Sequence, residues 1–112
     1  MNDLRVGVND RDGVIVVAVA GELDLATSGR LESKLRGVEA RRPPMLIIDL
    51  SQLSFIDSTG LRLIIGAHTR AREDERRLSI IPGPEAVQKV FHLALLEKRL
   101  DFIDDASAAE GP

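Results

Sequence analysis

Apolar positions divide the chain into short runs, and the first two have the spacing of β-strands. Residues 4–8 alternate between apolar and polar side chains, and residues 14–20 form a nearly continuous apolar, mostly β-branched run. The Asp12-Gly13 pair between them is a strong signal for a tight turn. The pattern predicts an antiparallel hairpin whose second strand is buried on both faces.

Two later apolar runs also predict strands. Residues 45–50 and 78–81 are too short for helices and have the continuous apolar character of buried central strands. Residues 100–103 are expected to add a short edge strand. The stretch 51–60 is rich in hydroxyl and acidic side chains, and we expect it to be a loop that leads into a helix.

Three stretches between these runs have apolar residues at helical spacing. The first helix is expected to be capped by Thr27 or Ser28 and to end before the prolines at 43–44. The second starts near Gly60 and is expected to run to about Arg76. The third is expected to start near Pro84, because proline suits the first turn of a helix.

The order of these elements predicts an α/β fold. Buried strands that alternate with amphipathic helices form parallel sheets through crossover connections. We therefore expect a single domain over residues 1–112, with a mixed, mostly parallel sheet of about four to five strands, an N-terminal β-hairpin and helices mainly on one side. Whether the other face is covered stays open, and residues 104–112 are expected to be a frayed tail.

Composition narrows the possible chemistry. The 112 residues include no Cys, Trp or Tyr and only two His, which excludes disulfides, thiolate nucleophiles and cysteine-based zinc sites. The net charge of −3 argues against a nucleic-acid binder, and the three phenylalanines are expected to lie in the core rather than to stack on bases. No apolar run is long enough to span a membrane and the N-terminus lacks a signal peptide, so we expect a cytoplasmic protein.

The remaining polar chemistry is concentrated in two strand-to-helix connections, residues 21–24 and 55–61. Both follow the C-terminal ends of central strands, where α/β sheets carry their functional sites. Asp24, Asp57 and Ser58 should therefore be near neighbours, together with Thr59. A purely structural interpretation is equally compatible with the spacing, because Asp and Ser commonly cap helices.

Gly60 is unusual in the first turn of a helix, where glycine costs about 1 kcal/mol relative to alanine. Its presence suggests that a partner or another loop approaches the backbone closely.

These connections carry a resemblance to a known family. Leu-Ile-Ile-Asp-Leu-Ser at residues 46–51, followed by Phe-Ile-Asp-Ser-Thr-Gly-Leu at 55–61, resembles the signature of the STAS domain family, in particular the bacterial anti-sigma factor antagonists. Gly-Glu-Leu-Asp at 21–24 is similar to the first loop of that family. The likeness extends from the hairpin to about residue 103.

The resemblance implies a phosphorylation switch in transcription regulation, of the kind used in stress responses, sporulation or development. The serine matching Ser58 is phosphorylated by an anti-sigma factor that is a serine kinase of the GHKL type, and Thr59 is the rival acceptor. The unphosphorylated protein binds that kinase and so frees a sigma factor; a metal-dependent serine phosphatase reverses the modification. The residues expected to contact partners are Glu22, Asp24, Asp57, Ser58, Thr59, Gly60 and Arg62.

We expect a protein that is not an enzyme, that needs no cofactor or metal, that binds neither nucleic acid nor membrane, and that is a monomer or weak dimer. Self-contained catalysis is disfavoured on other grounds too, because His68 lies about 15 Å along the helix from Ser58. The alternative is a STAS interaction module that does not switch, within a signalling scaffold or a lipid-transport complex.

One departure from the family concerns the third helix. The family often ends this helix with Thr-Gly-Leu, whereas the matching stretch here, residues 93–95, has no glycine. Because glycine is the usual C-terminal cap, we expect the helix to run on into residues 96–98.

Overall fold

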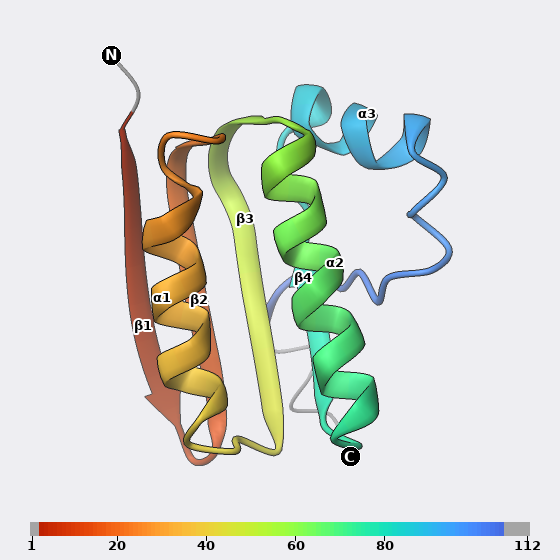
Figure 1. The fold of residues 1–112 in the computed structure, drawn as a ribbon. Helices are drawn as coiled ribbons and strands as arrows, with labels where there is room; N and C mark the ends of the chain where they lie inside the picture. Colours follow the sequence, from red (N-terminus) through yellow and green to blue (C-terminus); the bar gives the residue numbers. More distant parts are fainter. Residues whose placement is uncertain (1–2, 107–112) are drawn as a thin grey trace.

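The computed structural model describes residues 3–106, in which four strands and three helices follow one another as an α/β domain (Figure 1). The elements are β1 (Leu4–Arg11), β2 (Val14–Leu23), α1 (Ser28–Glu39), β3 (Met45–Ile56), α2 (Ser58–Glu73), β4 (Arg77–Ile81) and α3 (Glu85–Leu93). The predicted α/β fold and its element order are confirmed. None of the described helices has the length and apolarity needed to cross a membrane.

The four strands form one mixed sheet in the order β1-β2-β3-β4. β1 and β2 are antiparallel, and β3 and β4 continue the sheet in parallel. Asp12 and Gly13, which join the hairpin, have positive φ angles of 53° and 88°, as a two-residue type I′ turn requires. The predicted hairpin and mostly parallel sheet are therefore confirmed.

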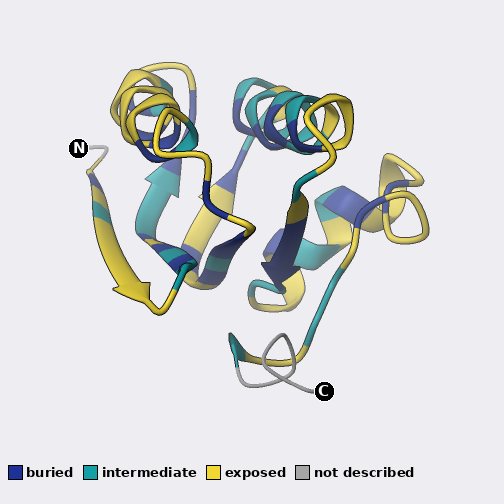
Figure 2. Ribbon diagram, turned by 90° about the horizontal axis from the view of Figure 1, so that it is seen from below, coloured by how far each residue is buried: buried dark blue, intermediate teal, exposed yellow. Residues whose placement is uncertain are grey.

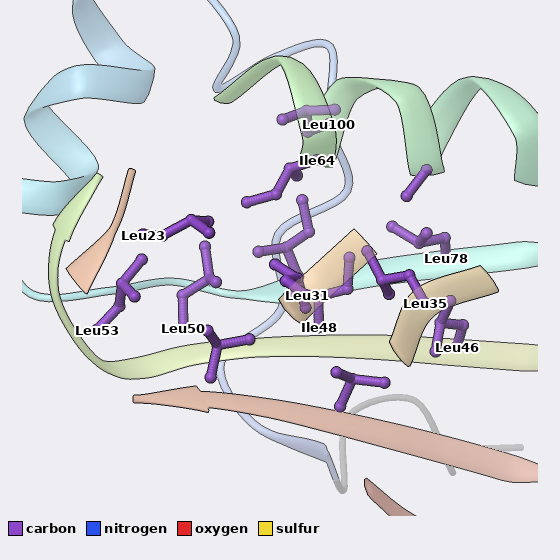
Figure 3. Close-up of a cluster of buried hydrophobic side chains, with 14 of the residues drawn as sticks. Leu23, Leu31, Leu35, Leu46, Ile48, Leu50, Leu53, Ile64, Leu78 and Leu100 are labelled. Carbon is purple, nitrogen blue, oxygen red and sulfur yellow. The ribbon is translucent and has the colours of Figure 1, made fainter. Parts of the chain in front are cut away.

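The main core lies between the sheet and two helices. α1 and α2 lie side by side on one face, whereas α3 lies to the side of this pair (Figures 1 and 2). Leucine and isoleucine side chains from the two helices and the central strands meet in one buried cluster (Figure 3). The burial follows from the predicted spacing, because Leu31, Leu35 and Val38 of α1 are all buried.

The opposite face of the sheet is only partly covered. Met45, Ile47 and Ile81 form a second buried cluster there, against which Ile103 and Ala106 of the C-terminal segment pack. The prediction that β2 is buried on both faces is wrong: alternate positions are buried, but the others are half-buried or, at Ala18, exposed.

β3 is longer than predicted. It continues through residues 51–56, which we expected to be a loop. Leu53 and Ile56 are both buried because the register against β2 shifts between them, and the intervening Ser54 and Phe55 are exposed. In contrast, α2 ends at Glu73 rather than near Arg76. Glu75 takes a positive φ of 55°, and the Arg76 N–H donates to the Ala71 carbonyl, which closes the helix.

The expectation that α3 runs on into residues 96–98 is wrong. The helix ends at Leu93 in a Schellman motif, in which Leu96 N–H donates to the Phe91 carbonyl and Leu95 N–H donates to the His92 carbonyl. Leu95 occupies the left-handed position with a φ of 60°. The chain therefore forms the glycine-type cap without glycine, one residue later than the family comparison suggested.

The predicted edge strand at 100–103 is reduced to a single bridge between Ile80 and Phe102, flanked by two backbone hydrogen bonds. The part of the expected frayed tail from residue 107 onward lies outside the described residues.

Candidate functional site

The two predicted connections meet at one end of the sheet. Glu22 is paired with Phe55, and Leu23 with Ile56, in the parallel register of β2 and β3. The chain therefore leaves both strands side by side, once toward α1 and once toward α2, at the end drawn uppermost in Figure 1. The expectation that both loops open on the same rim is confirmed.

Asp57 ties the two loops together. It is the N-cap of α2, and its Oδ1 accepts a hydrogen bond from Gly60 N–H at 3.0 Å. Its Oδ2 accepts from Leu25 N–H at 3.2 Å, and its own N–H donates to the Leu23 carbonyl at 3.1 Å. One side chain thus caps the helix and fixes the neighbouring loop, which is why an acidic residue is required at this position.

Ser58 is left with an uncommitted hydroxyl. It is the first residue of α2 and is exposed, and its Oγ makes no hydrogen bond within residues 3–106. The N–H groups of Ser58 and Thr59 likewise have no acceptor in this part of the chain, as is usual for the first turn of a helix. Asp57 caps the helix, so the structural interpretation is confirmed for Asp57 but does not apply to Ser58. Thr59 is less exposed than Ser58.

Asp24 has a clear structural role on the other loop. Its side chain is buried, and Oδ1 accepts from the N–H groups of Ala26 and Thr27 at 3.0 and 3.1 Å. The Thr27 hydroxyl, which we expected to cap α1, instead donates to the Glu22 carbonyl at 2.7 Å. Asp24 and Thr27 together hold the loop in a tight turn beside Asp57.

Gly60 is explained by close packing inside the protein. A Cβ atom at this buried position would lie 2.7 Å from Leu23 Cγ and 2.9 Å from Ile56 Cγ1. Both side chains come from strand ends in the buried core. Of the two explanations for this glycine, the approach of another segment is therefore correct, and no partner is needed to account for it.

The charges at the rim are mainly acidic. The Glu22 carboxylate is half-buried and makes no ion pair among the described residues, and Arg62 is exposed one turn into α2. Neither histidine contacts Ser58: His92 Nδ1 lies 2.7 Å from Glu97 Oε1, and His68 lies further along α2. A serine–histidine pair for catalysis is therefore not formed by the described side chains.

Sequence reasoning missed two residues of the rim. Leu25 and Phe55 are exposed and line a surface hollow together with Glu22 and Asp57. Phe55 was expected in the core, but its neighbour Ile56 occupies the inward position, and adjacent residues of a strand face opposite sides. The Phe-Ile pair at the end of a strand is the signal that one of the two must face outward.

Comparison with known proteins gives a consistent result. A family model described as "STAS domain" matches residues 5–109. An anti-sigma-F factor antagonist, RsfB of Mycobacterium tuberculosis, is 30% identical over 97 residues, which are 87% of this chain and 79% of that protein. The anti-sigma-B factor antagonist of Listeria monocytogenes is 27% identical over 89% of both chains.

A solved structure is similar throughout. An anti-sigma factor antagonist from Mycobacterium paratuberculosis superposes with a TM-score of 0.88 at 31% identity, over 96% of this chain and 92% of that one.

Proposed function

The chain belongs to the STAS domain family, and on that premise we propose that it is an anti-sigma factor antagonist switched by phosphorylation of Ser58. In this function the unphosphorylated protein binds an anti-sigma factor that is also a serine kinase of the GHKL type, and a sigma factor is released. The three similar proteins named above are anti-sigma factor antagonists, which supports the choice of partner. We place this action in the cytoplasm, where transcription takes place.

The observation that carries the proposal is the spare hydroxyl at the start of α2. Because Asp57 supplies the helix cap, Ser58 Oγ is exposed and makes no hydrogen bond among residues 3–106. A modifying enzyme can therefore reach the hydroxyl without disturbing the fold. Ser58 is preferred over Thr59 as the acceptor because it is the more exposed of the two.

In the proposed reaction, Ser58 Oγ attacks the γ-phosphorus of ATP. A bond forms between Oγ and phosphorus, the bond between that phosphorus and the β–γ bridging oxygen breaks, and ADP leaves. The hydroxyl proton passes to a base on the kinase. Every catalytic group in this step belongs to the kinase. The chain therefore needs only the Ser58 hydroxyl, although it has no cysteine and only two histidines.

The product should keep its fold but lose its partner. The unpaired N–H groups and the dipole at the start of α2 favour an anion there. The same dianionic group is attached to the residue next to Asp57, and an interface that fits the neutral hydroxyl would not accommodate its bulk and charge. Arg62, one turn on, offsets only part of that charge. A metal-dependent serine phosphatase would restore the binding form.

Phosphorylation in vitro tests the proposal directly. The protein is incubated with ATP and each GHKL kinase of the source cell, and the intact mass is measured before the site is mapped by peptide fragmentation. We expect one phosphate, located on Ser58, and none on the S58A variant. The matched T59A variant should be phosphorylated like the wild type. Phosphate on another residue, or none with any kinase, would overturn the proposal.

A further inference from the structure

Two exposed apolar side chains share a surface hollow with Asp57, the residue before Ser58, and contribute little to the core. Leu25, in the loop between β2 and α1, is 77% exposed, and Phe55, near the end of β3, is 47% exposed. They come from segments 30 residues apart in sequence, yet both line one surface hollow of about 530 Å³. The other residues that line it are Glu22, Asp24, Ala26 and Asp57.

Hydrogen bonds and strand pairing fix the backbone at both residues. Leu25 N–H donates to Asp57 Oδ2, and Ser28 Oγ donates to the Leu25 carbonyl, so the loop is fixed from both sides. Phe55 lies in β3, where it is paired with Glu22 of β2. Neither side chain is needed to maintain this arrangement, so the backbone that carries this apolar surface is already ordered before a partner covers it.

From this juxtaposition we propose that Leu25 and Phe55 are the apolar anchor by which the serine kinase docks before it phosphorylates Ser58. The inference rests on the proposed function and adds the residues that determine affinity for the partner. The choice of occupant follows from position: Asp57 forms a wall of the hollow and Ser58 is the next residue along the chain. A kinase that brings its catalytic site to Ser58 Oγ therefore covers this hollow.

The lining also defines the chemistry of the docking element. Leu25, Ala26 and Phe55 accept an apolar side chain of the kinase. Glu22, whose carboxylate is unpaired among the described residues, favours a basic residue next to that side chain. A few side chains that are packed into fully desolvated pockets typically dominate the binding energy of an interface.

Because the anchor is separate from the reacting hydroxyl, it should govern binding rather than the chemical step. Replacing Leu25 or Phe55 with serine is expected to raise the KM for phosphorylation about tenfold each, at nearly unchanged kcat. The double variant should approach the product of the two effects, about a hundredfold, if the contributions are independent. The conservative changes L25M and F55L should restore most of the affinity.

The experiment uses the full chain and the kinase that phosphorylates wild-type Ser58 in the assay above. Phosphorylation is followed by intact mass at varied protein concentration for L25S, F55S, the double variant and the two conservative variants. V8S is the matched control, because Val8 is also exposed, at 41%, but lies on the edge strand β1. Thermal unfolding of each variant verifies that it is folded; the exposure of both positions predicts little change.

The outcomes separate the two proposals. Higher KM values for L25S and F55S, with V8S and the conservative variants close to wild type, support the anchor. If wild-type Ser58 is phosphorylated but all variants have the same KM, the anchor is wrong and the proposed function stands. The anchor is also wrong if the serine variants change only the sedimentation of the protein alone, which would mean that a second copy occupies the hollow. If no kinase phosphorylates Ser58, the proposed function fails and the anchor with it.

Discussion

The N-terminus of α2 and the C-terminus of α3 are both capped, but one by a residue that favours the capping position and the other by a residue that does not. At α2 the favoured residue is in place: Asp57 caps the helix and fixes the adjacent loop, so Ser58 is spare. At α3 the capping hydrogen bonds are complete, but a disfavoured residue makes them, since Leu95 adopts a φ of 60° with 81% of its surface exposed. Both ends keep their geometry, yet only the first leaves a side chain free for chemistry.

The difference teaches where a modification can act without cost to the fold. Phosphate on Ser58 replaces no hydrogen bond of the helix cap, because the cap belongs to the preceding residue. A change at Leu95 acts directly on backbone strain, so it should alter stability. We therefore expect changes at Ser58 to leave the free energy of unfolding nearly unchanged and changes at Leu95 to alter it.

The largest effect is expected at Gly60, on the α2 side of the comparison. G60A should lower the free energy of unfolding by about 1–3 kcal/mol, because the new Cβ would overlap with the buried side chains of Leu23 and Ile56. Urea unfolding measures the change. The matched control is G29A in the first turn of α1, where a Cβ meets nothing within 4 Å and alanine should stabilise the helix by about 0.5–1 kcal/mol. Equal effects at both glycines would show that packing at Gly60 is unimportant.

The next largest effect on stability is expected at Asp57, which caps α2, in contrast to Ser58, which does not. D57A removes the helix cap and the acceptor of Leu25 N–H, so unfolding should become easier by about 1–2 kcal/mol. S58A should stay within about 0.5 kcal/mol of wild type, since its hydroxyl has no partner among the described residues. Chemical denaturation of both variants under the same conditions provides the test. A loss for S58A as large as that for D57A would contradict the claim that Ser58 is spare.

At the other helix end, L95G should stabilise the protein. Glycine accepts a positive φ that strains leucine, and we expect a gain of about 0.5–1 kcal/mol in the free energy of unfolding. L95A is the control, because alanine keeps the strain and should bring no comparable gain. A destabilised L95G, measured by thermal and urea unfolding, would mean that the exposed leucine side chain contributes more than its backbone costs.

The smallest effect concerns His68, which lies between the two regions. Burial lowers the pKa of His68 below its ordinary value of 6.5, the charges of Arg72 and Arg99 lower it further, and Asp101 opposes them. The fold therefore favours the neutral ring. His68 protonation therefore leaves the free energy of unfolding unchanged above about pH 6.5. Below that, the free energy of unfolding decreases as the pH falls through the unfolded-state pKa toward the folded-state pKa.

The variant H68Q should remove that pH-dependent contribution. The stability difference between H68Q and wild type should change as the pH falls from about 7.5 to about 5, in favour of the variant. Urea unfolding at several pH values measures it, and parallel pH profiles for the two proteins would show that His68 does not contribute.

The fold was predictable because its main signals are local. The Asp12-Gly13 turn, the β-branched runs and the spacing of Leu31, Leu35 and Val38 are each sufficient to identify their element. The extension of β3 to Ile56 was not predictable in this way, since residues 51–54, which are polar apart from Leu53, resemble a loop. The segment is a strand because Gln52, Leu53, Phe55 and Ile56 pair with β2. The end of α3 was missed because a complete set of capping hydrogen bonds overrode the poor propensity of Leu95.

The site was predictable in its position but not in its division of roles. The ends of parallel strands bring Asp24 and Asp57 together, as their places in the chain suggest. Only the geometry shows that Asp57 caps α2, that Asp24 holds its own loop, and that Gly60 makes room for Leu23. The exposure of Leu25 and Phe55 depends on the register of the strand ends, which apolar character alone does not reveal.

The most direct test of the central claim is the affinity of Ser58-phosphorylated protein for its kinase, measured by titration beside the free energy of unfolding. We expect the phosphate to lower the affinity by about a hundredfold or more, because an interface that fits the neutral Ser58 hydroxyl must then accommodate a bulky dianionic group, while the free energy of unfolding stays within about 0.5 kcal/mol of the unmodified protein. Unchanged affinity, or an affinity lost together with the fold, would contradict a switch that acts on binding and leaves the domain intact.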